Sequence, residues 1–333
     1  MKVALIASIG SLKNNISNTT GVGRYVQELK KKLSQNLQVD TIGYDNSSLL
    51  HSVKSLINLN FKNYRQYDII HLLEPKPLFP FLKKKFVITV HDLFFLRYRE
   101  SKGILTSFYP KSTLKSISYA DAIIAVSSLT AKEVRKYNKR VYVVNLGVSD
   151  TFFSTPLMKR KNKVFKIGYI GRVDHERKNL IRGIGVFKKF EEDAEFEIWG
   201  GYSEDNELSK KILKESIEDP RIKIKGPFKD EDIITIYDSF DAFFLPSKEE
   251  GFGLPILEAQ SRGVPVIVFK DSLIPEEVCK YCIKINDELP SIEEIKEFKE
   301  KYEKEMIKYA KQFTWDKTAK ETLKIYEKEA IVR

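Results

Sequence analysis

The feature that most constrains the fold is an alternation of short apolar runs with stretches of helical spacing, which occurs twice along the 333-residue chain. Residues 86–90, Phe-Val-Ile-Thr-Val, are apolar at nearly every position, as in strands that a parallel sheet buries on both faces. The runs that we interpret as strands are 3–7, 39–43, 68–73, 86–90, 122–126 and 141–145 in the first series, and 165–170, 196–199, 222–224, 242–245, 265–269 and 282–285 in the second. Two such series predict an α/β protein with two doubly wound, Rossmann-like domains.

The segment between the two series is basic and polar, with Lys159 to Lys163 as its centre, and reads as a linker. The tail from Ile292 to the end has a helical, charged pattern. Doubly wound domains bind ligands outside the carboxyl ends of their strands, so two of them facing one another would form a cleft. The loops that follow the apolar runs are therefore the places to look for functional residues.

The charge of the chain is unevenly distributed. Residues 1–152 carry 23 Lys and Arg against 10 Asp and Glu, a net of +13, whereas the remainder carries 34 against 36, a net of −2. This asymmetry favours an anionic partner for the first half, and the alternative is a solvated, lysine-rich surface. Residues 1–8 read as a strand instead of a signal peptide, and no apolar run approaches the roughly 20 residues of a membrane span. We therefore expect a cytoplasmic protein.

The strongest chemical signal is the segment from Leu245 to Ala259, Leu-Pro-Ser-Lys-Glu-Glu-Gly-Phe-Gly-Leu-Pro-Ile-Leu-Glu-Ala. It predicts a buried strand, a glycine-rich turn and a helix that begins near Pro255. Gly251 and Gly253 allow a ligand close to the backbone, and the start of the helix favours an anion such as phosphate. The carboxylates of Glu250, in the turn, and Glu258, expected in the first helical turn, can bind sugar or ribose hydroxyls.

A second loop, after the run 165–170, carries cations. Arg172 and Lys178 follow Gly171 and can together neutralise a diphosphate, the Arg in bidentate fashion. Arg177 stands beside Lys178 and leaves open which cation reaches the ligand. The alternative is a pair of surface cations.

These segments resemble the retaining glycosyltransferases of family 4, which have the two-domain GT-B fold. The Glu250-to-Glu258 element is the most specific match, and the loop from Gly171 to Asn179 resembles the diphosphate-binding loop of the family. Further matches are Thr20 to Tyr25 for the first glycine loop, Thr89 to Leu93 for the His-Asp loop, Ala125 to Thr130, and Asn145 to Ser149. The resemblance extends over nearly the whole chain.

The resemblance implies a domain plan and a set of site residues. Residues 1–152 would form an N-terminal acceptor-binding domain, 153–314 a C-terminal nucleotide-sugar-binding domain, and 315–333 a helix that crosses back to the N-terminal domain. His91 would orient the transferred sugar, and His91, Glu250, Arg172 and Lys178 would be the catalytic group. The donor-binding residues would be Gly21, Gly23, Gly171, Arg172, Lys178, Glu250, Gly251, Phe252, Gly253, Leu254 and Glu258. His71, which also ends an apolar run, is a weaker candidate for the acceptor pocket, and His175 is expected to be exposed.

The implied activity is transfer of a mannose- or glucose-type hexose from a GDP- or UDP-sugar to a hydroxyl of a glycan or lipid-linked acceptor, with retention of configuration. No cofactor is expected. No metal is expected either, because Asp230 to Asp232 precede a predicted helix whose dipole they complement, and Arg and Lys supply the positive charge. Anionic membrane lipid at the inner face of the cell membrane is a candidate contact of the basic half. Nucleic acid is not expected, because no nucleic-acid motif accompanies the charge.

Two other functions fit parts of the sequence. An NAD-dependent Rossmann oxidoreductase would need Gly-x-Gly-x-x-Gly directly after a strand, and the loop after residues 3–7 lacks it. A non-catalytic sugar-nucleotide binding protein would keep all the motif residues, and donor hydrolysis would distinguish it from an enzyme. Cys279 and Cys282 read as two small buried side chains, with a disulfide as the alternative.

Overall fold

The computed structural model describes residues 1–12, 21–45, 49–76, 85–98, 104–158 and 162–331. Internal contacts divide the chain into two compact units. Unit 1 consists of the described residues up to Gly147 together with those from Trp315 onward, and unit 2 consists of the described residues from Val148 to Thr314. The last helix therefore belongs, by its contacts, with the first part of the chain.

Unit 1 is built on a parallel sheet in the order β2-β1-β3-β4-β5-β6. Its strands are β1 (Lys2–Ser8), β2 (Gln38–Tyr44), β3 (Ile69–Leu72), β4 (Phe86–Val90), β5 (Ala122–Ala125) and β6 (Val141–Val143). β1 pairs with β2 on one side and with β3 on the other. The direction of winding changes between β1 and β3, and ligands bind outside the strand ends at such a point.

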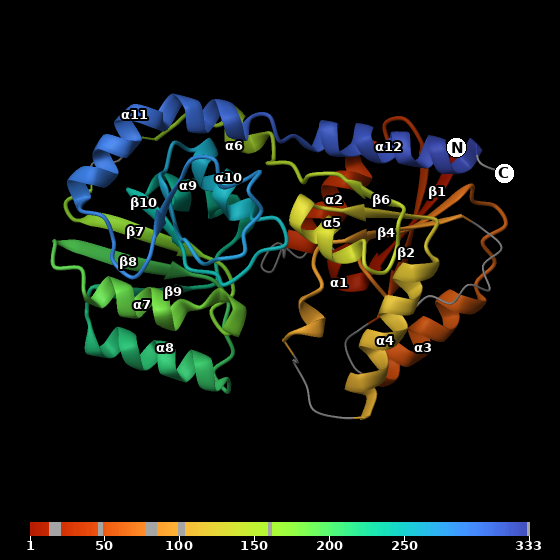
Figure 1. Cartoon of the computed structure of the whole chain (residues 1–333), viewed down its shortest axis with the longest axis horizontal. Helices are drawn as coiled ribbons and strands as arrows, with labels where there is room; N and C mark the ends of the chain where they lie inside the picture. The colour runs from red at the N-terminus through yellow and green to blue at the C-terminus, as the bar shows by residue number, and fades with distance from the viewer. Residues whose placement is uncertain (13–20, 46–48, 77–84, 99–103, 159–161, 332–333) are drawn as a thin grey trace. The chain divides into compact units, whose positions relative to one another are not determined.

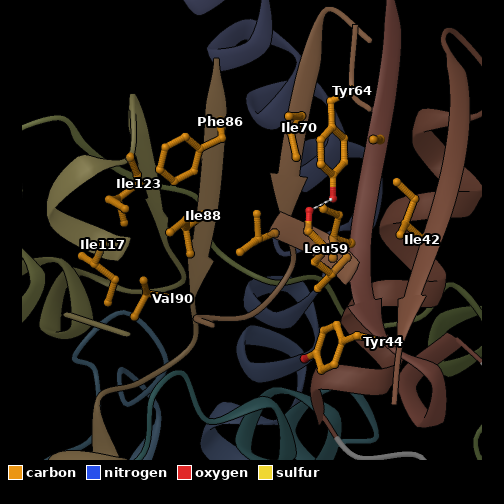
Figure 2. Packing of buried hydrophobic residues seen from close by; sticks show 14 of the residues in the cluster. Ile42, Tyr44, Leu59, Tyr64, Ile70, Phe86, Ile88, Val90, Ile117 and Ile123 are labelled. Carbon is orange, nitrogen blue, oxygen red and sulfur yellow. Dashed lines mark hydrogen bonds between the residues drawn. The ribbon is translucent and has the colours of Figure 1, made fainter. Parts of the chain in front are cut away.

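Helices cover both faces of this sheet. They are α1 (Ile9–Leu12), α2 (Gly21–Leu33), α3 (Leu49–Phe61), α4 (Ile104–Tyr119), α5 (Ser128–Val134) and α12 (Trp315–Ile331), with a 3₁₀ turn at Phe94–Leu96. α2 packs against α12. Figure 2 shows the core on one face, where Ile70 and Ile88 from neighbouring strands lie with Leu59 of α3 and Ile117 of α4. Alternate residues of each strand point to the opposite face.

Unit 2 contains a second parallel sheet, in the order β12-β11-β10-β7-β8-β9. Its strands are β7 (Phe165–Ile170), β8 (Ala194–Trp199), β9 (Ile222–Gly226), β10 (Ala242–Leu245), β11 (Val266–Phe269) and β12 (Cys282–Ile285). Its helices are α6 (Thr151–Ser154), α7 (Leu180–Lys188), α8 (Glu207–Glu218), α9 (Ile233–Asp238), α10 (Leu254–Ser261) and α11 (Ile292–Ala310). Figure 1 shows α7 beside α8, and α10 packs on α11. The winding changes between β7 and β10, which pair directly.

The two doubly wound α/β units confirm the predicted fold class. All twelve predicted runs form strands, and four of them, β4, β7, β10 and β12, have the predicted ends. The helical tail from residue 292 consists of two helices, α11 and α12, which residues 311–314 separate. None of the helices in the described part of the chain is long and apolar enough to cross a membrane.

Candidate active site

The two loops singled out in the second half of the sequence lie side by side in unit 2. Ala242 of β10 pairs with Ile167 of β7, so the loops that follow these strands leave the same edge of the sheet. Backbone bonds join them, because the Lys248 amide donates to the Arg177 carbonyl at 2.8 Å. The Asn179 side-chain amide also donates to the Pro246 carbonyl at 3.1 Å. The topology therefore places the predicted cation loop and glycine-rich turn at the point where such sheets bind ligands.

Glu250 is the centre of a buried charged cluster at this point. Lys178 Nζ lies 2.7 Å from its Oε1, and Arg177 Nη1 lies 3.1 Å from its Oε2. The Ser247 hydroxyl also donates to Oε1 at 2.7 Å. Glu250 is only 7% exposed, so these bonds form with little competition from water. The structure thus brings together the predicted Glu250 and Lys178, and adds Arg177 and Ser247.

The protonation of Glu250 follows from this arrangement. Burial alone would raise the pKa of the carboxyl group, but Lys178 and Arg177 outweigh it and lower the pKa to about 2. The carboxylate is therefore ionised throughout the neutral range. Two cations, Lys178 and Arg177, thus lie within hydrogen-bonding distance of this one carboxylate.

Arg172 occupies a different position from Lys178. Its guanidinium makes two bonds of 2.9 Å to the Asp174 carboxylate, and its side chain is 66% exposed. The neighbouring Gly171 is required by packing, since a Cβ there would lie 2.7 Å from the Tyr169 hydroxyl oxygen. That hydroxyl donates to the Arg172 carbonyl at 2.9 Å and fixes the path of the loop.

The glycine-rich turn leads into α10 as the sequence predicts. Gly253 has φ of 99°, in the left-handed region that favours glycine, and precedes the first helical residue, Leu254. Phe252 and Leu254 are buried, and the Phe252 ring meets that of Phe313 at 6.1 Å between centroids. Gly251 is half-buried in the same turn. The neighbouring side chains thus hold the turn that leads into α10.

Glu258 lies deeper than expected. The helix begins at Leu254, so Glu258 starts the second turn and not the first. Its side chain is 3% exposed, and the Tyr237 hydroxyl donates to its Oε2 at 2.9 Å. The correction follows from the helix start, and Tyr237 of α9 becomes the residue that orients this carboxylate.

His91 follows β4 in unit 1, at the carboxyl edge of the sheet. It is 9% exposed, and burial lowers the pKa of its imidazole. Nε2 lies 3.0 Å from the Leu73 carbonyl oxygen. Because a carbonyl only accepts, Nε2 carries the proton, and Nδ1 of the neutral ring is left as an acceptor. The Tyr25 ring packs edge-on against the imidazole, with centroids 4.8 Å apart.

The structure also shows where two glycines and two further histidines of the sequence analysis lie. α2 begins at Gly21, so Gly21 and Gly23 lie in its first turn. A Cβ at Gly21 would meet nothing within 4 Å among the described atoms. The acceptor-pocket interpretation of His71 is wrong, because the side chain is 0% exposed within β3. His175 in unit 2 is half-buried instead of exposed, and its Nδ1 accepts from the Arg177 amide at 3.4 Å.

Sequence reasoning missed several members of the site. Ser247 and Tyr237 carried no signal, because hydroxyl residues are common in turns and helices. Gly200 did carry one, as the first of two glycines directly after the run 196–199. A Cβ at Gly200 would lie 1.8 Å from the Gly171 carbonyl oxygen, so only glycine allows this close approach to the cation loop.

Metal ligands are not gathered in the part of the chain that the structure describes, where no three His, Cys, Asp or Glu side chains form a metal-binding group. Asp230–Asp232 form a 3₁₀ turn ahead of α9, as the dipole interpretation predicts. Cys279 and Cys282 are free thiols, the first of them buried.

Comparison with known families agrees with this arrangement. Residues 158–321 match the family model described as Glycosyl transferases group 1, and residues 42–152 match the model described as Glycosyltransferase Family 4. The chain is a family 4 glycosyltransferase. The two models together span most of both units of this glycosyltransferase, which excludes the oxidoreductase alternative.

Two proteins of related sequence are named as mannosyltransferases. The glycosyltransferase is 24% identical over 312 residues to O-antigen chain mannosyltransferase B of Escherichia coli, covering 78% of this chain and 81% of the relative. It is 23% identical over 227 residues to the MMP alpha-(1->4)-mannosyltransferase of Mycolicibacterium hassiacum, covering 63% and 54%.

Solved structures establish the fold. Sucrose-phosphate synthase of Thermosynechococcus elongatus superposes with a TM-score of 0.71 at 16% identity, covering 98% of each chain. Anabaena HepE in complex with UDP-glucose gives 0.69 at 13% identity, covering 98% of this chain and 100% of the other. The fold is therefore GT-B.

Proposed function

We propose that this glycosyltransferase moves a hexose from a UDP- or GDP-sugar to a hydroxyl of a glycan or lipid-linked acceptor, with retention of configuration. Two relatives that are mannosyltransferases by name support mannose as the first sugar to test, and the complex of a structural neighbour with UDP-glucose supports a nucleotide-sugar donor. Glucose stays the second candidate. In this proposal unit 2 binds the donor and unit 1 the acceptor.

The observation that carries the proposal is the convergence of Lys178 and Arg177 on Glu250 where β7 and β10 end. A donor diphosphate near the start of α10 would compete with Glu250 for these two cations. As the cations turn to the phosphate oxygens, the Glu250 carboxylate becomes available to sugar hydroxyls. Binding of the phosphate and binding of the sugar are then linked through one carboxylate.

Glu258 is the proposed ligand of the ribose hydroxyls. Its carboxylate is buried, and the Tyr237 hydroxyl donates a hydrogen bond to Oε2. This bond fixes the orientation of the carboxylate. A carboxylate accepts hydrogen bonds from two vicinal hydroxyls with charge assistance. Glu258→Ala should therefore weaken donor binding, while Glu250→Ala should mainly lower turnover.

The chemistry in this proposal is mainly electrostatic. Bond cleavage leaves negative charge on the diphosphate, and Lys178 and Arg177 stabilise that charge as it develops. In this proposal retention results from attack on the face that the leaving group occupies, and the leaving phosphate oxygen accepts the proton of the acceptor hydroxyl. His91 presents Nδ1 as a neutral acceptor to a hydroxyl of the transferred sugar, which orients the ring. These cations take the place of a divalent ion, so we propose a metal-independent reaction.

The basic first half of the chain suggests where the acceptor is met. We propose peripheral contact with anionic lipid at the inner face of the membrane, based on the net charge of +13 in residues 1–152. Four of the basic residues of this half, Lys83, Lys84, Arg99 and Lys102, lie outside the described part of the chain. Arg97 is exposed and pairs with Glu133 at 2.8 Å, whereas Phe95 packs against the core, so charge rather than aromatic insertion supports the contact.

The test is a transfer assay with GDP-mannose, UDP-glucose and simple alkyl glycoside acceptors. We expect one donor to give a glycosylated product and released nucleoside diphosphate, with the anomeric configuration of the donor in the product NMR spectrum. Glu250→Gln, which keeps the side-chain shape but removes the charge, is the matched control and should turn over slowly. An inverted product would refute retention, and donor binding without transfer or hydrolysis would favour the non-catalytic binding protein.

A further inference from the structure

A buried polar network lies in unit 1 on the sheet face opposite the core of Figure 2. Tyr326 of α12 lies 2.5 Å from His71 Nδ1, measured from the hydroxyl oxygen. Thr89 Oγ1 lies 2.7 Å from His71 Nε2 and 2.8 Å from the Tyr25 hydroxyl. All four side chains are at most 1% exposed. The network thus joins α12, β3, β4 and α2 through side chains alone.

The members of the network are all neutral. Burial lowers the pKa of His71 to about 3 and raises the pKa of both Tyr326 and Tyr25 above the usual range. A neutral imidazole has one donor and one acceptor nitrogen, so Tyr326 and Thr89 must play opposite roles toward His71. Removing either hydroxyl leaves a buried nitrogen without its partner and disturbs the whole chain of bonds.

His91 is held by the same elements. Thr89 precedes it by two residues, near the carboxyl end of β4. The Tyr25 ring, whose hydroxyl bonds to Thr89, packs edge-on against the imidazole. The carbonyl that accepts from His91 Nε2 belongs to Leu73, two residues after His71. One of these two contacts of the His91 ring, that with the Tyr25 ring, is therefore anchored by a member of the network.

We propose that Tyr326, His71, Thr89 and Tyr25 are positioning residues that set the orientation of His91, with the last helix of the chain holding one end of the network. The proposal rests on the proposed function, in which His91 contacts the transferred sugar. None of the four residues needs to touch the substrate. Tyr326 would act on catalysis from a position 235 residues further along the chain than His91.

The experiment compares variants that remove one buried hydroxyl each. Tyr326→Phe and Thr89→Val break the network with little change of shape, and Thr89→Ser restores the hydroxyl. The matched control is Tyr64→Phe, because the Tyr64 hydroxyl is also buried in unit 1 and donates to the Leu59 carbonyl at 3.0 Å, on the other face of the sheet (Figure 2). Loss of stability alone would affect this control as well.

Two readouts separate positioning from general destabilisation. The chain has four histidines, so the imidazole NMR signals of His91 can be assigned by their loss in His91→Gln. Tyr326→Phe and Thr89→Val should shift these signals and lower kcat by about 10- to 100-fold, as expected for a misplaced catalytic group, while KM for the donor keeps its wild-type value. Thr89→Ser and Tyr64→Phe should match the wild type in both readouts.

Unchanged His91 signals in Tyr326→Phe and Thr89→Val, together with kcat equal to that of Tyr64→Phe, would overturn the proposal. A loss of kcat in Thr89→Val that Thr89→Ser does not restore would overturn it as well. Failure of the proposed function gives a different result, since the wild type itself would then transfer no sugar. The NMR comparison would still decide whether the network orients His91.

Discussion

Acid should destabilise unit 1 through His71. The imidazole has a pKa of about 3 in the folded protein, because burial and then the nearby His91 disfavour its charge, against 6.5 in the unfolded chain. Between pH 3 and pH 6.5, the unfolded chain therefore binds a proton at His71 that the folded chain does not bind. The stabilisation of the folded protein that His71 provides in this way is complete above pH 6.5, and it decreases as the pH falls toward 3.

The size of the effect follows from the two pKa values. Each pH unit below 6.5 removes about 1.4 kcal/mol, so the loss between pH 8 and pH 5 is about 2 kcal/mol for a shift of this size. Glu250 does not contribute in this window, because its lowered pKa affects stability only below its ordinary value of 4.5. The lowered pKa of His91 also makes the folded protein less stable as the pH falls, as that of His71 does.

Urea unfolding at pH 8 and pH 5 measures this loss. His71→Gln has no titrating group at this position but keeps the His91 contribution. The stability of the wild type should therefore fall by about 2 kcal/mol more than that of His71→Gln between the two pH values. Equal losses in the two proteins would refute the reasoning, because they would show that His71 binds its proton alike in the folded and unfolded chains.

The remaining predictions concern the donor site, the metal and the membrane. Lys178→Ala should lower kcat/KM by an amount equivalent to about 2–4 kcal/mol, as for a lost oxyanion donor, and wild-type activity in this variant would remove its assignment to the diphosphate. Arg177→Ala should lower kcat/KM more than Arg172→Ala, because of the two only Arg177 bonds to Glu250. The opposite order would assign Arg172, and not Arg177, to the diphosphate. Activity should survive EDTA, and a complete loss that Mn²⁺ restores would show a metal requirement. Co-sedimentation with anionic liposomes should be strong at low salt and weaker at physiological ionic strength, and triple replacement of Lys83–Lys85 by Ser should reduce it; no binding at low salt would contradict the membrane proposal.

The strands and the donor loops could be predicted because their signals are local. A run such as Phe86–Val90 is apolar on both faces only if both faces are covered, and β4 forms there with the predicted ends. The loops after β7 and β10 could likewise be assigned to ligand binding from the sequence, because doubly wound sheets place their ligand site at the carboxyl ends of their strands. Glu250 and Lys178 do meet there.

Contacts between distant residues could not be predicted in this way. His71 and Tyr326 are separated by 255 positions, and each looks unremarkable in its own segment. The role of Arg177 depends on the 3₁₀ turn Glu176–Lys178 and on Asn179, whose φ is 55°, which together direct adjacent side chains to one carboxylate.

Binding of a nucleotide sugar to unit 2 is the central claim, and thermal unfolding with a panel of UDP- and GDP-hexoses tests it most directly. A ligand at 100 times its Kd adds about 2.7 kcal/mol to the stability of the protein that binds it. We predict a clear rise in Tm with at least one nucleotide sugar, a smaller rise in Lys178→Ala, and no rise with the free hexose. A wild-type protein that no nucleotide sugar stabilises, or a Lys178→Ala variant stabilised as much as the wild type, would contradict the account.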